Sequence, residues 1–364
     1  MGTLTHKAAR AAYGTAIDAV LKHVKKDREK GLLELVDLTE KYMGDNFQKE
    51  NYEAARKMIQ DPDNKWVKYV NHMIDELDPY VIRQTALNLG YEAAFYGTKT
   101  IREMRKKYDC NIPWLILMDP TSACNLHCTG CWAAEYGNKL NLSFDEIDSI
   151  IQQGKEMGTY FYIYTGGEPM VRKNDLISLC NKHSDCIFLC FTNATLIDRA
   201  FAEDMLRVKN FIPAISVEGD ELSHDGRRGD GSFHAVTRAM DILKKNRLPF
   251  GISCCYTSAN MDMITSEEFY DQMINWGASF VWNFHYMPVG NDAVPELMPT
   301  PEQREYIYHK IREYRNTKDI FSIDFQNDAE YVGGCIAGGK RYLHINANGD
   351  VDPCVFIHYS DSNI

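Results

Sequence analysis

The chain has 364 residues, of which 45% are hydrophobic and 25% are charged, and its formal net charge is −11. This composition is typical of a globular protein, and the length suffices for one large domain or two smaller ones. The negative charge argues against a general nucleic-acid-binding protein, and no apolar run predicts a membrane-spanning helix. The first residues lack the hydrophobic core of a secretion signal, so we expect a cytoplasmic protein with reduced thiols.

Residues 1–110 are predicted to form a helical region, because apolar residues recur there at the helical period and turn signals separate the segments. The region carries two basic clusters. They comprise Lys7, Arg10, Lys22, Lys25, Lys26 and Arg28, and then Arg102, Arg105, Lys106 and Lys107. A basic amphipathic helix on an acidic protein predicts a peripheral contact with a membrane surface or an acidic partner. The alternative is that these helices only cap the domain that follows.

Residues 111–319 alternate between apolar strands and amphipathic helices. The predicted strands are 114–119, 159–165, 187–193, 212–218, 250–257 and 279–287. The predicted helices are 145–157, 173–184, 198–207, 233–245, 265–276 and 301–316. Such alternation indicates parallel β/α units, and six units predict an open, partial (β/α)6 barrel of the TIM type. Chemistry in such barrels collects at the carboxyl ends of the strands.

Residues 320–364 are predicted to form a β-hairpin extension, because an Asn-Gly turn separates two strand-like segments there. No further element follows the hairpin. We therefore expect this extension to be cut short of its natural end.

Three cysteines lie within eight positions, Cys124, Cys128 and Cys131, directly after the first predicted strand. A structural zinc site needs four ligands, and a disulfide would leave one thiol over. Three thiolates on a [4Fe–4S] cluster would leave one iron open to a small molecule. Six other cysteines are predicted to be small buried hydrophobes: Cys110, Cys180, Cys186, Cys190, Cys254 and Cys255.

The Cys-x3-Cys-x2-Cys spacing, followed by Gly-Gly-Glu-Pro after the second strand, resembles the radical S-adenosylmethionine (SAM) superfamily. The resemblance implies a [4Fe–4S] cluster on Cys124, Cys128 and Cys131, with SAM chelated at the open iron. One electron then breaks the C5′–S bond of SAM, and the 5′-deoxyadenosyl radical takes hydrogen from a substrate. An external one-electron donor of the flavodoxin or ferredoxin type is implied as a partner.

The resemblance also implies which residues bind SAM, all of them near strand ends. They are Gly166, Gly167, Glu168, Asn193, Ser216, Glu218 and Arg228. Among these, Arg228 lies in a segment similar to one large branch of the family and is implied as the partner of the SAM carboxylate. One position departs from the family pattern: the residue before the last cysteine is commonly aromatic, but here it is Gly130, and Trp132 follows the cysteine.

Cys335 and Cys354 frame the carboxyl-terminal hairpin and resemble the opening half of the SPASM or twitch extension of the same superfamily. The resemblance implies a second iron–sulfur cluster that these two thiols alone cannot complete. The alternative is two ordinary buried thiols.

The sequence leaves the substrate open, and the basic amphipathic helix favours a lipid or another hydrophobic molecule. Three alternatives stand beside this hypothesis. The first is a peptide- or protein-modifying maturase, the second is a non-catalytic iron–sulfur electron carrier, and the third is a zinc-stabilised structural protein. An iron–sulfur carrier usually gives its cluster four protein ligands, so the triple of cysteines favours an enzyme.

Overall fold

The computed structural model describes residues 3–44 and 47–364. The amino-terminal region is helical, as predicted. Its elements are α1 (Thr3–Val24), α2 (Arg28–Met43), α3 (Lys49–Ile59), α4 (Lys65–Glu76), α5 (Pro79–Thr85), the π-helix η2 (Ala86–Gly97) and α6 (Thr98–Tyr108). Polar side chains set several of the starts. The side chain of Asp78, for example, accepts hydrogen bonds from the first backbone amides of α5, where Pro79 occupies the first turn.

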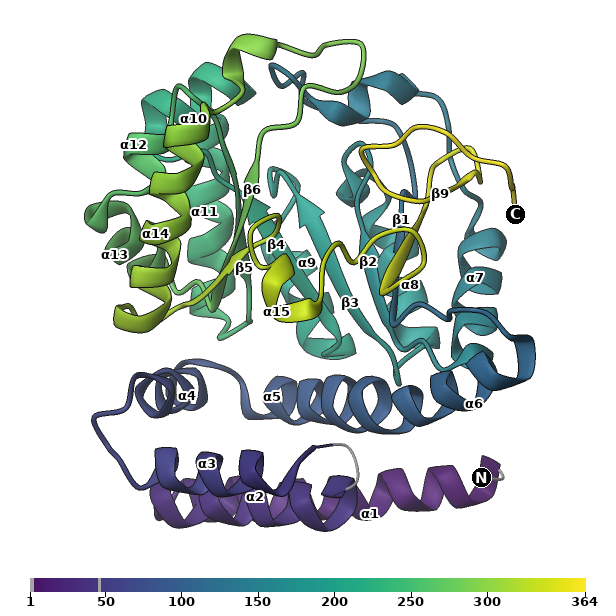
Figure 1. Cartoon of the computed structure of the whole chain (residues 1–364), viewed down its shortest axis with the longest axis vertical. Helices are drawn as coiled ribbons and strands as arrows, with labels where there is room; N and C mark the ends of the chain where they lie inside the picture. Colours follow the sequence, from purple (N-terminus) through teal and green to yellow (C-terminus); the bar gives the residue numbers. More distant parts are fainter. Residues whose placement is uncertain (1–2, 45–46) are drawn as a thin grey trace.

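The helical region covers the amino ends of the strands (Figure 1). Tyr69 donates a hydrogen bond to the carbonyl of Ser279 at 2.8 Å, and Asn88 donates to the carbonyl of Cys186 at 2.7 Å. Both carbonyls lie just before a strand begins. The helices therefore close the end of the barrel opposite to the one where parallel β/α barrels carry their chemistry.

Six parallel strands form the barrel in sequence order. They are β1 (Leu115–Met118), β2 (Phe161–Tyr164), β3 (Ile187–Thr192), β4 (Phe211–Ser216), β5 (Gly251–Tyr256) and β6 (Phe280–His285). The predicted helices pack around them as α7 (Phe144–Met157), α8 (Lys173–Lys182), α9 (Arg199–Val208), α11 (Ser232–Lys245), α13 (Glu267–Trp276) and α14 (Pro301–Thr317). The predicted partial barrel is confirmed.

The segment after residue 320 extends the sheet at both of its edges. Strand β7 (Phe321–Asp324) pairs in parallel with β6, and β8 (Tyr342–Ile345) pairs in parallel with β1. Strand β9 (Val351–Asp352) then returns antiparallel to β8, which gives the order β7-β6-β5-β4-β3-β2-β1-β8-β9. The predicted hairpin is present, but it joins the barrel sheet beside β1 instead of standing apart from it.

Short helices occur in the loops, where none was predicted. They are η3 (Trp132–Tyr136), η4 (Pro169–Arg172), α10 (Glu221–Arg228), α12 (Met261–Ile264), η5 (Pro295–Leu297) and α15 (Ala329–Val332). Among the described residues, no helix is both long and apolar enough to cross a membrane.

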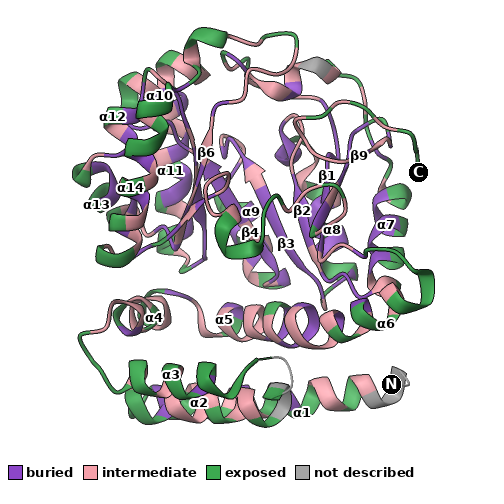
Figure 2. Ribbon diagram, in the orientation of Figure 1, coloured by how far each residue is buried: buried purple, intermediate pink, exposed green. Residues whose placement is uncertain are grey.

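The strands of the barrel are largely buried (Figure 2), and the alternation of their side chains divides the core into an outer and an inner part. On β1, Ile116 and Met118 pack against the surrounding helices, whereas Leu115 and Leu117 face the barrel interior. The interior also receives partly buried aromatic side chains, among them Phe191 and Trp282. The inside of the barrel is therefore apolar, and it leads to the strand ends where the predicted site residues lie.

Candidate functional site

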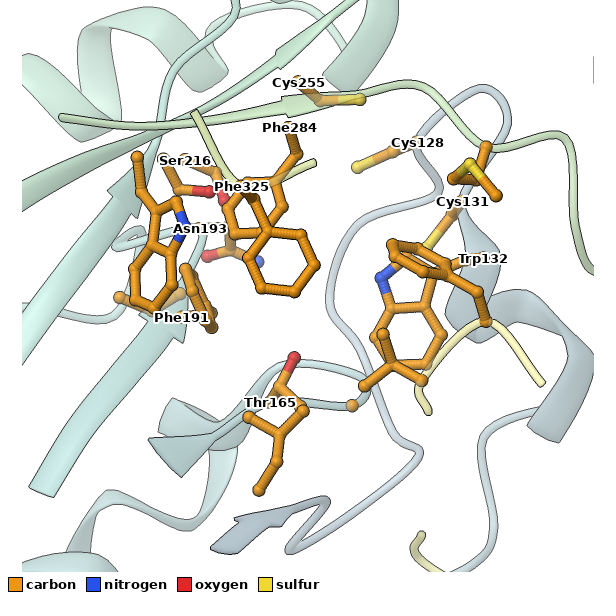
Figure 3. Close-up of a pocket in the computed structure, with 18 of the residues that line it drawn as sticks. Cys128, Cys131, Trp132, Thr165, Phe191, Asn193, Ser216, Cys255, Phe284 and Phe325 are labelled. Atoms are coloured by element: carbon orange, nitrogen blue, oxygen red, sulfur yellow. The ribbon is translucent and has the colours of Figure 1, made fainter. Parts of the chain in front are cut away.

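A cavity of about 1380 Å³, which includes space open to solvent, lies at the carboxyl ends of the strands and reaches into the barrel. All three cysteines of the motif border it, together with the Gly-Gly-Glu loop after β2. Figure 3 shows two of these cysteines, Cys128 and Cys131, at the cavity. Asn193, Ser216 and Arg228 border it too. The structure thus brings six of the seven residues implied for SAM binding to one cavity that the three thiols share.

The cysteine loop is held in place by backbone hydrogen bonds to two neighbouring segments. The amide of Ser122 donates to the carbonyl of Leu140, and the amide of Thr129 donates to the carbonyl of Arg227, both at 2.9 Å. The three cysteines are free and half-buried. Among the described residues, no three His, Cys, Asp or Glu side chains converge closely enough to hold a single metal ion.

Burial suppresses ionisation of Cys124 and Cys128 when these thiols have no partner. It raises the pKa of Cys124 to about 11, and it also raises the pKa of Cys128 although the nearby Arg228 opposes the shift. A buried thiolate needs positive charge beside it. Iron ions would supply that charge, so the donor set fits an iron–sulfur cluster bound through the thiolates.

The glycines of the second motif allow the loop after β2 to lie against the cysteine loop. Gly166 has a φ of +101°, and a Cβ on Gly167 would lie 2.3 Å from the carbonyl oxygen of Ala123. The amide of Gly167 donates to Thr121 O at 3.0 Å, and that of Glu168 donates to Ala123 O at 2.8 Å. The two motifs therefore form one hydrogen-bonded unit, which leaves no room for a side chain at Gly167.

The contact at Gly167 makes a prediction about substitution. Gly167→Ala is expected to push the cysteine loop away and to lower the free energy of unfolding by about 1–3 kcal/mol, a usual cost of overpacking. Weaker SAM binding should accompany this loss. Gly90→Ala is the matched control, because no atom lies within 4 Å of the added Cβ. Urea unfolding and SAM titration of both variants check the prediction. An equal free energy of unfolding and an equal affinity for SAM in the two variants would contradict it.

Gly130, the departure from the family pattern, has a structural reason. Its φ is +68°, and a Cβ there would lie 2.5 Å from the hydroxyl oxygen of Tyr286. Tyr286 comes directly after β6, is buried and lines the cavity. Tyr286 therefore occupies the space that a side chain at residue 130 would need.

Glu168 is fully buried at the cavity wall. Its carboxylate accepts hydrogen bonds from the Thr192 hydroxyl at 2.6 Å, the Asn193 amide at 2.7 Å and the Met170 amide at 2.9 Å. Burial raises the pKa of Glu168, and the same three donors oppose that shift. Asn193 in turn donates from its side chain to Asn125 at 2.9 Å. The end of β3 is thereby tied to both motif loops.

Glu218 is placed differently from the other predicted SAM contacts, because it is fully buried and is not among the cavity-lining residues. Its Oε1 forms ion pairs with Nη1 of Arg227 at 2.8 Å and Nη2 of Arg228 at 2.6 Å. Both arginines do line the cavity, and Arg228 Nη1 lies 3.9 Å from Cys128 Sγ. In this structure Glu218 positions two cations beside the cysteine loop instead of facing the cavity itself.

Helix α10 makes this arrangement possible. Asp220 caps its first turn by accepting from the amide of Ser223, and the two arginines fall in the last turn. The predicted helices do not include this segment, and Arg227 is not among the predicted site residues. The signal in the sequence that points to Arg227 is its position directly before Arg228.

Two of the six cysteines predicted to be buried are not. Cys110 is exposed, because it follows the end of α6, whereas Cys255 is half-buried and lines the cavity from β5. Figure 3 shows Cys255 at the same cavity as Cys128. The strand alternation explains the difference on β5, since Cys254 points to the outer core and Cys255 points inward.

The carboxyl-terminal cysteines differ in their surroundings. Cys335 is exposed, and Cys354 is half-buried with its Sγ 3.2 Å from the hydroxyl of Tyr342. The segment around them contributes Ile336, Tyr342, Val355 and Phe356 to the cavity wall. The second cluster stays a prediction, but the extension does close one side of the cavity.

Several side chains of the basic clusters bind within the protein. Arg10 forms an ion pair at 2.6 Å with the fully buried Glu92, and Arg28 pairs with Asp75. Arg105 donates to the carbonyl of Ile112 at 2.9 Å. These contacts favour the alternative in which the helices cap the barrel, and the membrane contact stays a prediction.

The fold and the cavity define the chain as an enzyme built on a partial β/α barrel, with free thiols at the mouth. Residues 118–273 match the family model described as the radical SAM superfamily. The resemblance carried by the two motifs is thereby confirmed.

Proteins similar to this chain come from several microorganisms. An AdoMet-dependent heme synthase of Methanosarcina barkeri is 24% identical over 283 residues, which cover 70% of this chain and 80% of that protein. A cysteine-type anaerobic sulfatase-maturating enzyme of Clostridium perfringens is 28% identical over 164 residues, which cover 40% and 44%. Among solved structures, Streptococcus suis SuiB bound to S-adenosylmethionine matches with a TM-score of 0.59 at 18% identity, over 86% of this chain and 75% of SuiB. This last likeness shows a shared fold.

Proposed function

We propose that this radical SAM enzyme removes a hydrogen atom from a hydrophobic substrate, a lipid or another large apolar molecule, bound inside the barrel. The observation that carries the proposal is the wall of the cavity beyond the two motifs. That wall is apolar and largely aromatic, and includes Leu117, Ile163, Phe191, Trp282, Phe284 and Phe325. Apolar walls bind ligands mainly by removing apolar surface from water.

The residues at the mouth fit the cofactors that the superfamily implies. Cys124, Cys128 and Cys131 would hold a [4Fe–4S] cluster, and the glycine loop leaves backbone exposed where SAM would lie against it. Such a cluster would supply the electron that cleaves SAM reductively and so starts hydrogen abstraction, and it would receive this electron from an external one-electron donor.

The chain's own side chains would orient SAM and keep it next to the substrate. Glu168 is fixed by three hydrogen bonds at the cavity wall, where its carboxylate would attract the ammonium group of SAM. Arg227 and Arg228 bring two positive charges to the other side, where they attract the SAM carboxylate. The aromatic wall excludes water from the substrate, which protects a reactive intermediate from side reactions.

The named relatives give independent support for an apolar substrate. The heme synthases match about 70% of this chain, whereas the sulfatase-maturating enzyme matches 40%. Heme is a large, mostly apolar molecule, and a substrate of comparable character suits the aromatic wall.

The experiment starts with anaerobic reconstitution with iron and sulfide, followed by SAM and dithionite. Formation of 5′-deoxyadenosine, measured by mass spectrometry, tests the SAM chemistry. A cell extract is then divided into an organic-solvent fraction, a peptide fraction and a small polar fraction, and each is added in turn. We expect the organic fraction to stimulate formation of 5′-deoxyadenosine. Stimulation by the peptide fraction alone would favour a maturase and contradict an apolar substrate.

The exposed Cys335 gives a separate prediction about the extension. Cys335→Ala is expected to leave 5′-deoxyadenosine formation within about twofold of wild type, because this side chain is exposed and is not among the cavity-lining residues. If a second cluster forms, the variant should contain less iron per chain and should turn over substrate more slowly. Iron analysis and the 5′-deoxyadenosine assay, run on the same preparation, check both parts. Loss of SAM cleavage would contradict the prediction.

A further inference from the structure

A buried ion cluster joins the carboxyl-terminal extension to the barrel. His344, on β8, is fully buried, and its Nε2 lies 2.9 Å from Oδ1 of Asp119, which directly follows β1. Its Nδ1 lies 3.4 Å from Oδ2 of Asp352 on β9. A carboxylate oxygen lies close to each ring nitrogen, although neither pair has hydrogen-bond geometry. The two negative charges favour the positively charged imidazolium.

The same cluster touches both halves of the proposed SAM site. A Cβ on Gly166 would lie 2.8 Å from Cγ of Asp119, so this carboxylate packs directly beneath the glycine loop. Trp132, the residue after Cys131, lines the cavity and stands edge-on to the His344 ring, with 6.2 Å between ring centroids. His344 itself is not among the residues that line the cavity.

Further contacts fix the segment that follows the cysteine loop. The hydroxyl of Tyr136, at the end of η3, donates to Oδ2 of Asp352 at 3.3 Å. His358 packs against the rings of both Trp132 and Tyr136, with centroid distances of 6.2 and 4.9 Å. The extension therefore contacts both ends of the short helix that begins right after the third cysteine.

We propose that His344 is a positioning residue for SAM, which holds the Gly166 loop and Trp132 in the arrangement that the cofactor needs. The inference rests on the proposed function, because it takes the cysteine loop and the glycine loop as the SAM site. It gives the extension a role in the SAM step itself. That role does not require the extension to hold a second cluster.

The charges around His344 predict how this role depends on pH. The ionisable groups that face it are Asp119 from β1 and Asp352 from β9, with Tyr136 of η3 bonded to Asp352 and His358 packed behind Trp132. Burial alone would lower the pKa of His344, but the two carboxylates outweigh it and raise this pKa to about 9. Above that pH His344 loses the positive charge that holds the two carboxylates together. SAM binding should therefore weaken as pH rises through about 9.

The test compares His344→Gln with His183→Gln in the reconstituted protein. His183 is also a buried histidine bonded to a carboxylate, Asp148 at 2.8 Å, but its partner lies on α7 and neither residue lines the cavity. The readouts are the Kd of SAM, taken from the change it causes in the EPR spectrum of the reduced cluster, and iron content. Both are measured between pH 7 and pH 10.

We expect His344→Gln to raise the Kd of SAM by about tenfold with unchanged iron content, as is usual for a lost supporting contact behind a ligand. The Kd of the wild type should rise near pH 9, that of His344→Gln should stay flat, and His183→Gln should follow the wild type. A wild-type Kd and pH profile in His344→Gln would overturn the inference. A wild type that fails to cleave SAM would instead overturn the proposed function.

A second variant covers the case in which His344→Gln does not fold. Asp352→Asn keeps the size of the side chain and removes one of the two carboxylates that raise the pKa of His344. The rise in the Kd of SAM should then begin at lower pH than in the wild type. An unshifted profile in this variant would also overturn the inference.

Discussion

Cys128→Ala is expected to abolish formation of 5′-deoxyadenosine. Cys128 lines the cavity beside Arg228, at 3.9 Å from its guanidinium, and is one of only three thiols in the motif. A cluster that already has one open iron would be left with two protein ligands, too few to hold it in place. We expect iron content and the visible absorbance of the cluster to fall together with the activity. Anaerobic reconstitution followed by mass spectrometry measures the product.

The control for this prediction is Cys110→Ala. Cys110 is exposed beyond the end of α6, so its loss should change neither iron content nor SAM cleavage. If Cys128→Ala retained SAM cleavage at the level of this control, the three thiols would not be the cluster ligands. The proposed function would then be wrong at its first step.

Glu218→Gln is expected to lower the free energy of unfolding by about 3–5 kcal/mol, measured by urea denaturation without cofactors. The carboxylate is fully buried and is the shared ion-pair partner of Arg227 and Arg228. Its removal leaves two largely buried guanidinium groups without their counter-charge, and breaking a buried pair typically costs this much. Asp204→Ala removes a surface partner of Arg207 and should cost no more than about 1 kcal/mol.

The pH dependence of this loss has a definite sign. Burial alone would raise the pKa of Glu218, but the two arginines outweigh it and hold the pKa below its ordinary value. The charge on Glu218 therefore stabilises the folded state above the ordinary glutamate pKa, and this contribution disappears as pH falls through the lowered pKa. The difference in the free energy of unfolding between Glu218→Gln and the wild type should shrink over that acidic range. A difference independent of pH would contradict the assigned ion pairs.

The barrel was predictable because its signals are local. The strands are short apolar runs, and the helices between them keep the helical period, so both could be located from neighbouring residues. On β3, for example, the predicted range 187–193 differs by one residue from Ile187–Thr192. The two motifs were equally readable, since Cys124, Cys128 and Cys131 are close in the chain.

The short loop helices and the pairing of the extension were not predictable in the same way. Helix α10 has only eight residues, too few for a period to show, and its place is set by the contact of Arg227 and Arg228 with Glu218. The edge at which β8 pairs depends on β1, more than 220 residues earlier in the chain. Nothing in the local sequence of β8 indicates which strand at the edge of the sheet is free to pair with it.

The sequence by itself determined the partial barrel, the cysteine and glycine motifs, and hence the superfamily. Only the tertiary structure decided what the remaining residues do. In the folded protein Glu218 pairs with two arginines instead of facing the cavity, and Cys255 lines the cavity. The buried His344 lies between Asp119 and Asp352. The physical reason is that a charge buried in a protein must find its partner in space, and Asp119 and His344 are brought together only when β8 pairs with β1.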